Sequence, residues 1–441
     1  MGTKTQRARD LGIPFDGLQG KINAITDVAG VYVGQRKIDV NTLHTGVTAI
    51  LPLLNDQQPN FDSDGTPNQG HGINTLVPAA CHSINGCGEM TGTHWIEESG
   101  FLNGPILLTN TVSVGTVRDA VIKYSISLQK APQTIDINLD VFGPLLPVVA
   151  ETYDGWLNDI LSFSVDEMMV KNALDDATNS GPNAKVDEGN VGAGTGTTCY
   201  DWKGGIGTAS RVVTPYQVYP DGKPSTLPTW TGDPTPQYNV GVLVQANQGT
   251  YWDLVIRGVP VGSYIAPPIT AMPAADTIPS TVDPANGRRT PTPIKNTRKS
   301  SIIVVVATDA PMLPGQLKRL AKRATHGIAR TGTNTNDDSG ELVIAFSTST
   351  SNEHAWYADQ VVDMNTVPND NLDPFFDAVA QATEEAILNA MVMSDTIEVD
   401  YPDGPKHVAK SISDPDVLPT LLNLLKTYNL MNPPASASPA S

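Results

Sequence analysis

The sequence has no long apolar run and few cysteines. In 441 residues, no stretch reaches the roughly 18 apolar residues of a membrane-spanning helix, and residues 1–7 lack the apolar segment of a secretory signal. The three cysteines, Cys81, Cys87 and Cys199, show no C-x-x-C spacing, which argues against a disulfide framework or a structural zinc site. We therefore expect no membrane span and a cytoplasmic protein.

Positive charge is also scarce. The chain has 28 Lys and Arg residues against 46 Asp and Glu residues, a net charge of -18. Nucleic acids and anionic membranes are bound through cationic faces, so neither is an expected partner. A cationic or amine-bearing ligand fits this charge better.

Motifs of several enzyme classes are missing. The seven histidines form no HExxH pair, no GxSxG elbow occurs, and the last glycine of the glycine-rich residues 189–197 precedes Thr-Thr-Cys, where a phosphate loop needs Lys-Ser or Lys-Thr. A Cys/His pair around His82 is disfavoured, because free cysteines usually pack as small apolar residues. No metal or organic cofactor is therefore expected. The glycine-rich residues remain open as turns or as an anion-binding nest of backbone N–H groups.

The length allows two or three domains or one large layered α/β unit. Short β-type runs and apolar runs predict strands at residues 31–33, 46–51, 105–111, 241–247, 301–307 and 342–347. Helical spacing predicts helices at residues 115–128, 156–172, 314–324, 373–393 and 418–430. Residues 55–72 are expected to form a loop and residues 433–441 a disordered tail. This mixed order suggests stacked sheets covered by helices.

One apolar run begins at a serine. Five β-branched aliphatic residues, 302–306, follow Ser301, and a run without alternation predicts a strand buried on both faces. Residues 266–298 have linker composition and no hydrophobic period. A serine that becomes a new N-terminus carries its own base, because the α-amine has a pKa of roughly 7.7 to 8.0. Ser301 is thus either such a nucleophile or an ordinary residue at the start of a strand.

The same residues resemble a known family. Residues 301–311 and 316–321 resemble the self-cleavage site and following helix of the DmpA-type aminopeptidases, which include the L-aminopeptidase/D-amidase/D-esterase enzymes and the β-peptidyl aminopeptidases. Further stretches match in the family's order at residues 7–13, 23–28, 88–92, 150–155, 189–197, 203–210 and 339–341. The resemblance covers nearly the whole chain.

The resemblance implies a four-layer αββα fold, like that of the ornithine acetyltransferases, in one domain spanning residues 1–441. It implies self-cleavage between Ser300 and Ser301 into an α chain, residues 1–300, and a β chain, residues 301–441. Residues 266–300 would then form a flexible tail before the cut. No cofactor is implied, and a homotetramer is expected.

Three residues of the new β chain would carry the chemistry. Ser301 would be the nucleophile and, through its freed amine, the general base. Ser339 would hydrogen-bond that amine, and Glu341 would orient or charge it. Without the resemblance, Glu341 reads as a solvated charge beside a strand.

Three residues of the α chain would complete the site. Asn247 would donate its side-chain N–H to the oxyanion, Tyr153 would contact the same centre, and Glu151 would hold the free ammonium of the substrate. The residues alone leave other interpretations open: Asn247 as a turn former, Tyr153 as a half-buried aromatic residue, and Glu151 as an acid at a helix N-terminus.

The chain departs from the family at the cleaved bond, where Ser300 replaces the common glycine, and in a long segment between Asn247 and Ser301. The expected reaction is hydrolysis of an N-terminal residue, of β-amino, L-α or D type, from short peptides, amides or esters. Acyl transfer or hydrolysis of ω-amide oligomers is the alternative in the same fold, although those relatives use threonine. An uncut, non-catalytic binding protein is the alternative outside enzymes.

Overall fold

The computed structural model describes residues 6–52, 76–127, 146–214, 237–267, 280–282, 289–291, 300–349, 361–402, 404 and 406–428. The loop expected at residues 55–72 and the tail expected at residues 433–441 lie outside the described residues. So does most of the linker expected at residues 266–300. Its described part includes a short antiparallel ladder formed by β11 (Ser280–Val282) and β12 (Arg289–Pro291).

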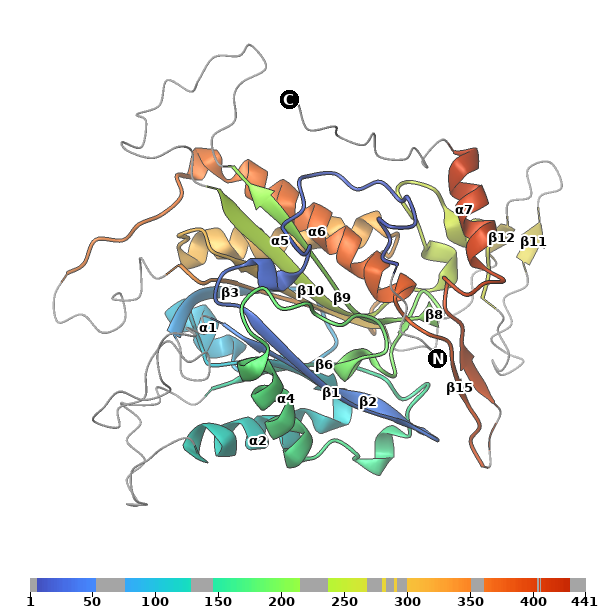
Figure 1. The fold of residues 1–441 in the computed structure, drawn as a ribbon, viewed down its shortest axis with the longest axis horizontal. Coiled ribbons are helices and arrows are strands. Elements are labelled where there is room, and N and C mark those ends of the chain that lie inside the picture. The colour runs from blue at the N-terminus through green and yellow to red at the C-terminus, as the bar shows by residue number, and fades with distance from the viewer. Residues whose placement is uncertain are drawn as a thin grey trace, which may run out of the picture.

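The first sheet has four strands in the order β1-β2-β5-β6. Their bounds are Tyr32–Val40, Leu43–Leu51, Ile106–Asn110 and Val148–Thr152. Two helices, α2 (Val114–Ser127) and α4 (Glu167–Asn179), pack on one face of this sheet through a cluster of buried apolar side chains. The four strands thereby form one layer with a helical cover (Figure 1).

The second sheet has six strands in the order β4-β3-β14-β13-β10-β9. Their bounds are Phe101–Asn103, Leu76–Gly86, Gly340–Ser347, Ser301–Thr308, Tyr238–Asn247 and Gly205–Val213. The helices α5 (Pro314–Arg330) and α6 (Asp373–Val392) cover its outer face. The remaining described elements of more than three residues are α1 (Thr93–Ser99) and α7 (Leu418–Thr427).

The inner faces of the two sheets share an apolar core. Strand β13 shows why its sequence lacks alternation: Ile303 and Val305 point into the core between the sheets, whereas Ile302 and Val304 pack on the helical side. Both faces are therefore dry, as continuous apolar runs predict. The layers run helix, sheet, sheet, helix (Figure 1), which confirms the αββα fold.

The helix expected at residues 156–172 is wrong for residues 156–166. That part forms turns and a short 3-10 helix, Ile160–Ser162, and α4 begins only at Glu167. The side chain of Asp166 accepts a hydrogen bond from Met169 N at 2.8 Å, so it caps the helix. The apolar spacing before it comes from loop residues such as Leu157, which is buried.

Helix α6 also differs from its expected character. The sequence indicates one apolar face, formed by Phe376, Val379, Ala380, Ile387, Ala390 and Met391. In the structure almost the whole helix is buried, including Glu384 and Glu385. These carboxylates are paired with arginines from other segments, Glu385 with Arg9 and Arg211, which makes burial of their charge tolerable.

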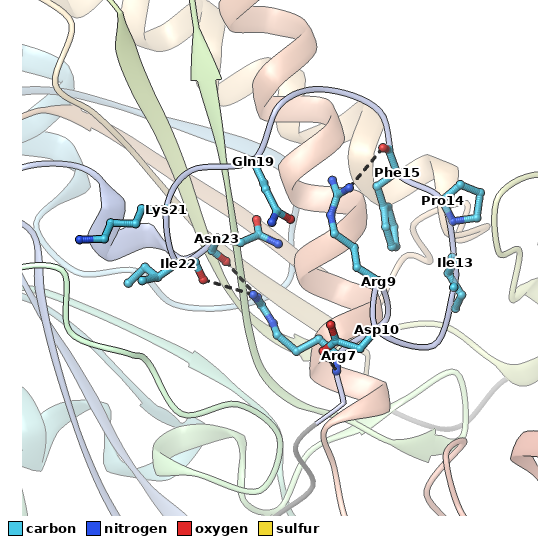
Figure 2. Close-up of a pocket in the computed structure, with 11 residues that line it drawn as sticks. Arg7, Arg9, Asp10, Ile13, Pro14, Phe15, Gln19, Lys21, Ile22 and Asn23 are labelled. Carbon is cyan, nitrogen blue, oxygen red and sulfur yellow. Dashed lines mark hydrogen bonds between the residues drawn. The ribbon is translucent and has the colours of Figure 1, made fainter. Parts of the chain in front are cut away.

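The N-terminal segment crosses α6 and lines a pocket of about 520 Å³ (Figure 2). Ala8 N donates to Asn389 Oδ1 at 3.1 Å, and Arg9 forms a two-point pair with Glu385 at 2.7 and 2.8 Å. Arg7 pairs with Glu188 at 2.6 Å. The arginine charges of this pocket are thus matched by carboxylates, and the contacts anchor the segment on the helix.

Candidate active site

Ser301 is the first residue of β13 and lies between two strands of the sheet. On one side it is in register with Asn247, the last residue of the antiparallel strand β10. On the other side it is in register with Gly340, the first residue of the parallel strand β14. Ser301 is only 5 % exposed. Sheet pairing thus brings together the Ser301, Asn247 and Ser339-Gly340-Glu341 stretches.

Several hydrogen bonds hold the peptide group before Ser301. Ser301 Oγ donates to the carbonyl oxygen of Ser300 at 2.6 Å. Gly340 N lies 3.1 Å from that oxygen and 3.2 Å from Ser301 Oγ, and its N–H donates to both. The hydroxyl of Ser300 accepts from Gly249 N at 2.8 Å. Ser301 Oγ and the carbonyl of the expected cleavage site are therefore in contact.

Glu341 is fully buried next to Ser339. The Ser339 hydroxyl donates to one oxygen of the Glu341 carboxylate, and the other oxygen has no hydrogen-bond partner among the described residues. Burial raises the pKa of Glu341 to about 7, and the Ser339 hydrogen bond opposes that rise. Asn85 Nδ2 donates to the Ser339 carbonyl and so fixes this turn. Glu341 is not the solvated charge that its sequence context also allowed.

Asn247 is held by both ends of its amide. Its Oδ1 accepts from Thr198 N at 2.8 Å, and its Nδ2 donates to the carbonyl oxygen of Tyr153 at 3.0 Å. An amide nitrogen carries two protons. Within the part of the chain described, Nδ2 donates to this one acceptor, which leaves a proton for a substrate oxygen.

Tyr153 contacts Asn247 through its backbone carbonyl oxygen. The phenol ring packs over Gly155, where a Cβ would lie 2.4 Å from the hydroxyl oxygen. Burial, and then the charge of Asp154, raise the pKa of the Tyr153 hydroxyl. Its contact with Asn247 therefore positions the amide group, and a role for its hydroxyl stays a prediction.

Glu151 comes from the first sheet. It lies on β6 and not at a helix start; its Oε1 accepts from Glu89 N at 3.0 Å, and its Oε2 accepts from the Thr111 hydroxyl. A Cβ on Gly88 would lie 3.2 Å from Glu151 Oε1 and 3.5 Å from Gly340 Cα. The glycine thus separates the carboxylate from the start of β14, and Glu151 lies close to the Ser301 end of the second sheet.

Two carbonyls of the glycine-rich residues accept hydrogen bonds from a buried lysine that sequence reasoning missed. Lys203 Nζ donates to the carbonyls of Gly194, Thr197 and Gly204 at 3.1, 2.9 and 2.8 Å. Lys203 is fully buried, and this burial lowers its pKa to about 7. The carbonyls here accept hydrogen bonds from a lysine amine, whereas an anion-binding nest would present N–H groups. The following residue, Thr198, supplies the N–H that holds Asn247.

The described residues also bear on metal binding and on membrane crossing. No group of three His, Cys, Asp or Glu side chains there is arranged to hold a metal ion. No helix in the same part of the chain is long and apolar enough to cross a bilayer.

Comparisons with known proteins agree on one family. The β-peptidyl aminopeptidase BapA of Sphingosinicella microcystinivorans is 42% identical over 89% of this chain and 86% of its own length. The BapA of Sphingosinicella xenopeptidilytica is 39% identical over the same shares.

Solved structures lead to the same family. The L-aminopeptidase D-Ala-esterase/amidase of Ochrobactrum anthropi, described as a variant of the Ntn hydrolase fold, superimposes with a TM-score of 0.73 at 35% identity and covers 97% of this chain and 100% of its own. A β-aminopeptidase of Burkholderia sp. gives 0.69 at 34% identity, covering 96% and 99%. The model of peptidase family S58 matches residues 23–401. These matches confirm the resemblance to the DmpA-type aminopeptidases, and the chain belongs to peptidase family S58.

Proposed function

We propose that this peptidase cleaves its own chain between Ser300 and Ser301 and then uses Ser301 as the nucleophile of an aminopeptidase. The observation that carries the proposal is the position of Ser301 at the start of an interior strand, between Asn247 and Gly340. Such a position keeps a new N-terminus in place after the cut. The family membership supports the aminopeptidase activity.

In the cleaved enzyme the Ser301 amine is the base. The hydroxyl attacks the substrate carbonyl, its proton passes to the amine, and the amine delivers that proton to the leaving nitrogen. An ester on Ser301 Oγ remains and is hydrolysed by water. Asn247 Nδ2 donates to the oxyanion in both steps.

Glu341 and Ser339 act on the new amine. Glu341 is in register with Ile302, the residue after Ser301, so the amine forms near a buried carboxyl. An ammonium group close by favours the ionised carboxylate. Cleavage therefore shifts Glu341 toward its charged form, which pairs with the Ser301 amine.

The substrate requires a free amine, because Glu151 supplies the negative charge at this end of the site. The names of the relatives point to β-peptides and to L-aminoacyl or D-alanyl amides and esters. We propose short compounds of these kinds as substrates. A panel of β-homo-, L-α- and D-aminoacyl amides, each free or N-acetylated, tests this.

Replacing the Glu151 carboxylate makes that test more specific. Glu151→Gln should lower kcat/KM for free amines about 100-fold, the cost of leaving a charge without its partner, and should remove the preference over N-acetylated analogues. Glu167→Gln, at an exposed surface pair, is the control. An unchanged preference in Glu151→Gln would assign amine binding elsewhere.

Self-cleavage is tested on a denaturing gel. The wild type should give two bands, and Edman sequencing of the smaller should read Ser-Ile-Ile-Val-Val. Ser301→Ala should remain one chain and lose turnover of an aminoacyl p-nitroanilide. A single wild-type band, or turnover by Ser301→Ala, would refute the proposal.

The proposal also includes a cellular location and an oligomeric state. The described cysteines are free thiols, as in a reducing compartment, so we propose a cytoplasmic location, to be checked by cell fractionation. A homotetramer, expected from the resemblance, can be tested by light scattering of the purified protein.

A further inference from the structure

The residue before the expected cleavage site is held by its side chain. Ser300 is 5 % exposed, and its hydroxyl accepts from Gly249 N at 2.8 Å. A glycine at this position would have no hydroxyl and could not make this contact.

The donor of this hydrogen bond is itself rigidly placed. Gly249 follows β10 with φ of 76°, a conformation that favours glycine, and a Cβ there would lie 2.3 Å from the ring of Tyr200. Tyr200 is fully buried, its N–H donates to the Gln248 carbonyl at 2.7 Å, and its hydroxyl pairs with Thr331 at 2.7 Å. The Gly249 N–H thus belongs to a packed turn next to Asn247.

The carbonyl of Ser300 is held from the opposite side. Gly340 N donates to it at 3.1 Å, and Ser301 Oγ lies 2.6 Å from the same oxygen. Ser300 is therefore fixed through its hydroxyl by the turn after β10 and through its carbonyl by the start of β14. A backbone N–H aimed at a carbonyl stabilises the negative charge that forms there when the carbon is attacked.

We infer that Ser300 is a positioning residue for self-cleavage: its hydroxyl, bound by Gly249, holds the Ser300 carbonyl on the Gly340 N–H, which binds the oxyanion of that step. Ser301 Oγ forms an ester with the carbonyl carbon of Ser300, the C–N bond breaks, and the Oγ proton goes to the departing Ser301 nitrogen. Water then hydrolyses the ester, giving a Ser300 carboxylate and the free Ser301 hydroxyl. The inference rests on the proposed self-cleavage.

The positioning role of Ser300 affects self-cleavage and does not affect the later aminopeptidase turnover. After cleavage Ser300 is the C-terminal residue of the long chain, and the aminopeptidase steps do not use it. Loss of its hydroxyl should therefore slow the cut and leave the finished enzyme unchanged. A residue needed only for general stability would not show that separation.

The experiment follows precursor decay in pulse-labelled cell-free translation. Ser300→Ala and Ser300→Gly should cleave at least tenfold more slowly than wild type, and Ser300→Thr, which keeps a hydroxyl, should restore most of the rate. Once fully processed, Ser300→Ala should match the wild-type kcat and KM within twofold. Ser162→Ala, at an exposed serine, is the matched control.

Folding is checked in chains that cannot be cut. Ser301→Ala and the double variant Ser300→Ala/Ser301→Ala should melt within a few degrees of each other. Wild-type-like cleavage of Ser300→Ala would overturn the inference and leave the proposed function intact, as would equal losses in processing and in kcat. Absence of cleavage in the wild type would instead defeat the proposed function itself.

Discussion

Asn247 and Ser301 lie opposite each other, as the last residue of β10 and the first residue of β13. The amide is fixed by the Thr198 N–H and the Tyr153 carbonyl, so it does not need to reorganise when charge develops on a substrate. Preorganised donors of this kind contribute most to transition-state stabilisation.

Asn247→Asp isolates the donor. Aspartate keeps an oxygen for the Thr198 N–H and lacks the amide protons, so in processed enzyme kcat should fall about 100-fold or more with little change in KM. Steady-state kinetics on gel-verified cleaved protein measure this. Asn239→Ala, at the far end of the same strand, should retain kcat. Activity of Asn247→Asp within threefold of wild type would contradict the assignment.

Glu341 should make the uncut protein less stable as pH rises. Its pKa of about 7 lies above the unfolded value of roughly 4.3, so the folded state binds more protons between these values. The stability contributed by the protonated form is complete below about pH 4 and is lost as pH rises through about 7.

The comparison uses Ser301→Ala, which stays uncut, with and without Glu341→Gln. The difference in free energy of unfolding, from urea titrations, should be small at pH 5 and should favour Glu341→Gln by up to about 3 kcal/mol at pH 8. A difference that is constant with pH would show that Glu341 does not titrate in this range.

Lys203 should be required for both stability and rate. Lys203→Met leaves the carbonyls of Gly194, Thr197 and Gly204 without their donor, which should cost about 3 kcal/mol or more. Because Thr198 follows this loop and holds Asn247, kcat should fall as well. Urea unfolding and kinetics measure the two effects.

The matched control is Lys185→Met, at an exposed lysine, for which the change should stay within about 0.5 kcal/mol. If Lys203→Met lost stability and kept its full kcat, the lysine would support the fold and not the placement of Asn247.

Much of the layered fold could be predicted from apolar runs. The stretch after Ser301 indicates a strand with two dry faces, and it occupies such a position. Helix α6 shows the limit of periodicity, because the partners of Glu384 and Glu385 come from segments distant in the chain. Residues 156–165 show a second limit of periodicity, since a single capping residue, Asp166, decides where α4 begins.

The candidate site was predictable where side chains carry the chemistry. The motifs containing Ser301, Asn247 and Ser339 meet in the structure, although their roles stay predictions. The contacts of Gly340 and Gly249 could not be predicted, because every residue except proline has a backbone N–H and only the fold shows which ones converge. Lys203 could have been noticed as a lysine within an apolar, glycine-rich stretch, but its acceptors are backbone carbonyls without a sequence signal.

Under the proposed self-cleavage, the placement of β13 and β14 has a consequence for the cleaved molecule. These two strands of the short chain lie between β3 and β10 of the long chain, so neither piece keeps the second sheet complete by itself. Separation of the pieces requires melting the second sheet, and recovery then becomes a second-order reaction between two polypeptides. The uncut chain should refold at a rate independent of concentration, whereas the mature enzyme, once denatured and diluted, should fail to recover. The folded state of the cleaved enzyme would therefore depend on the chain having folded before it was cut.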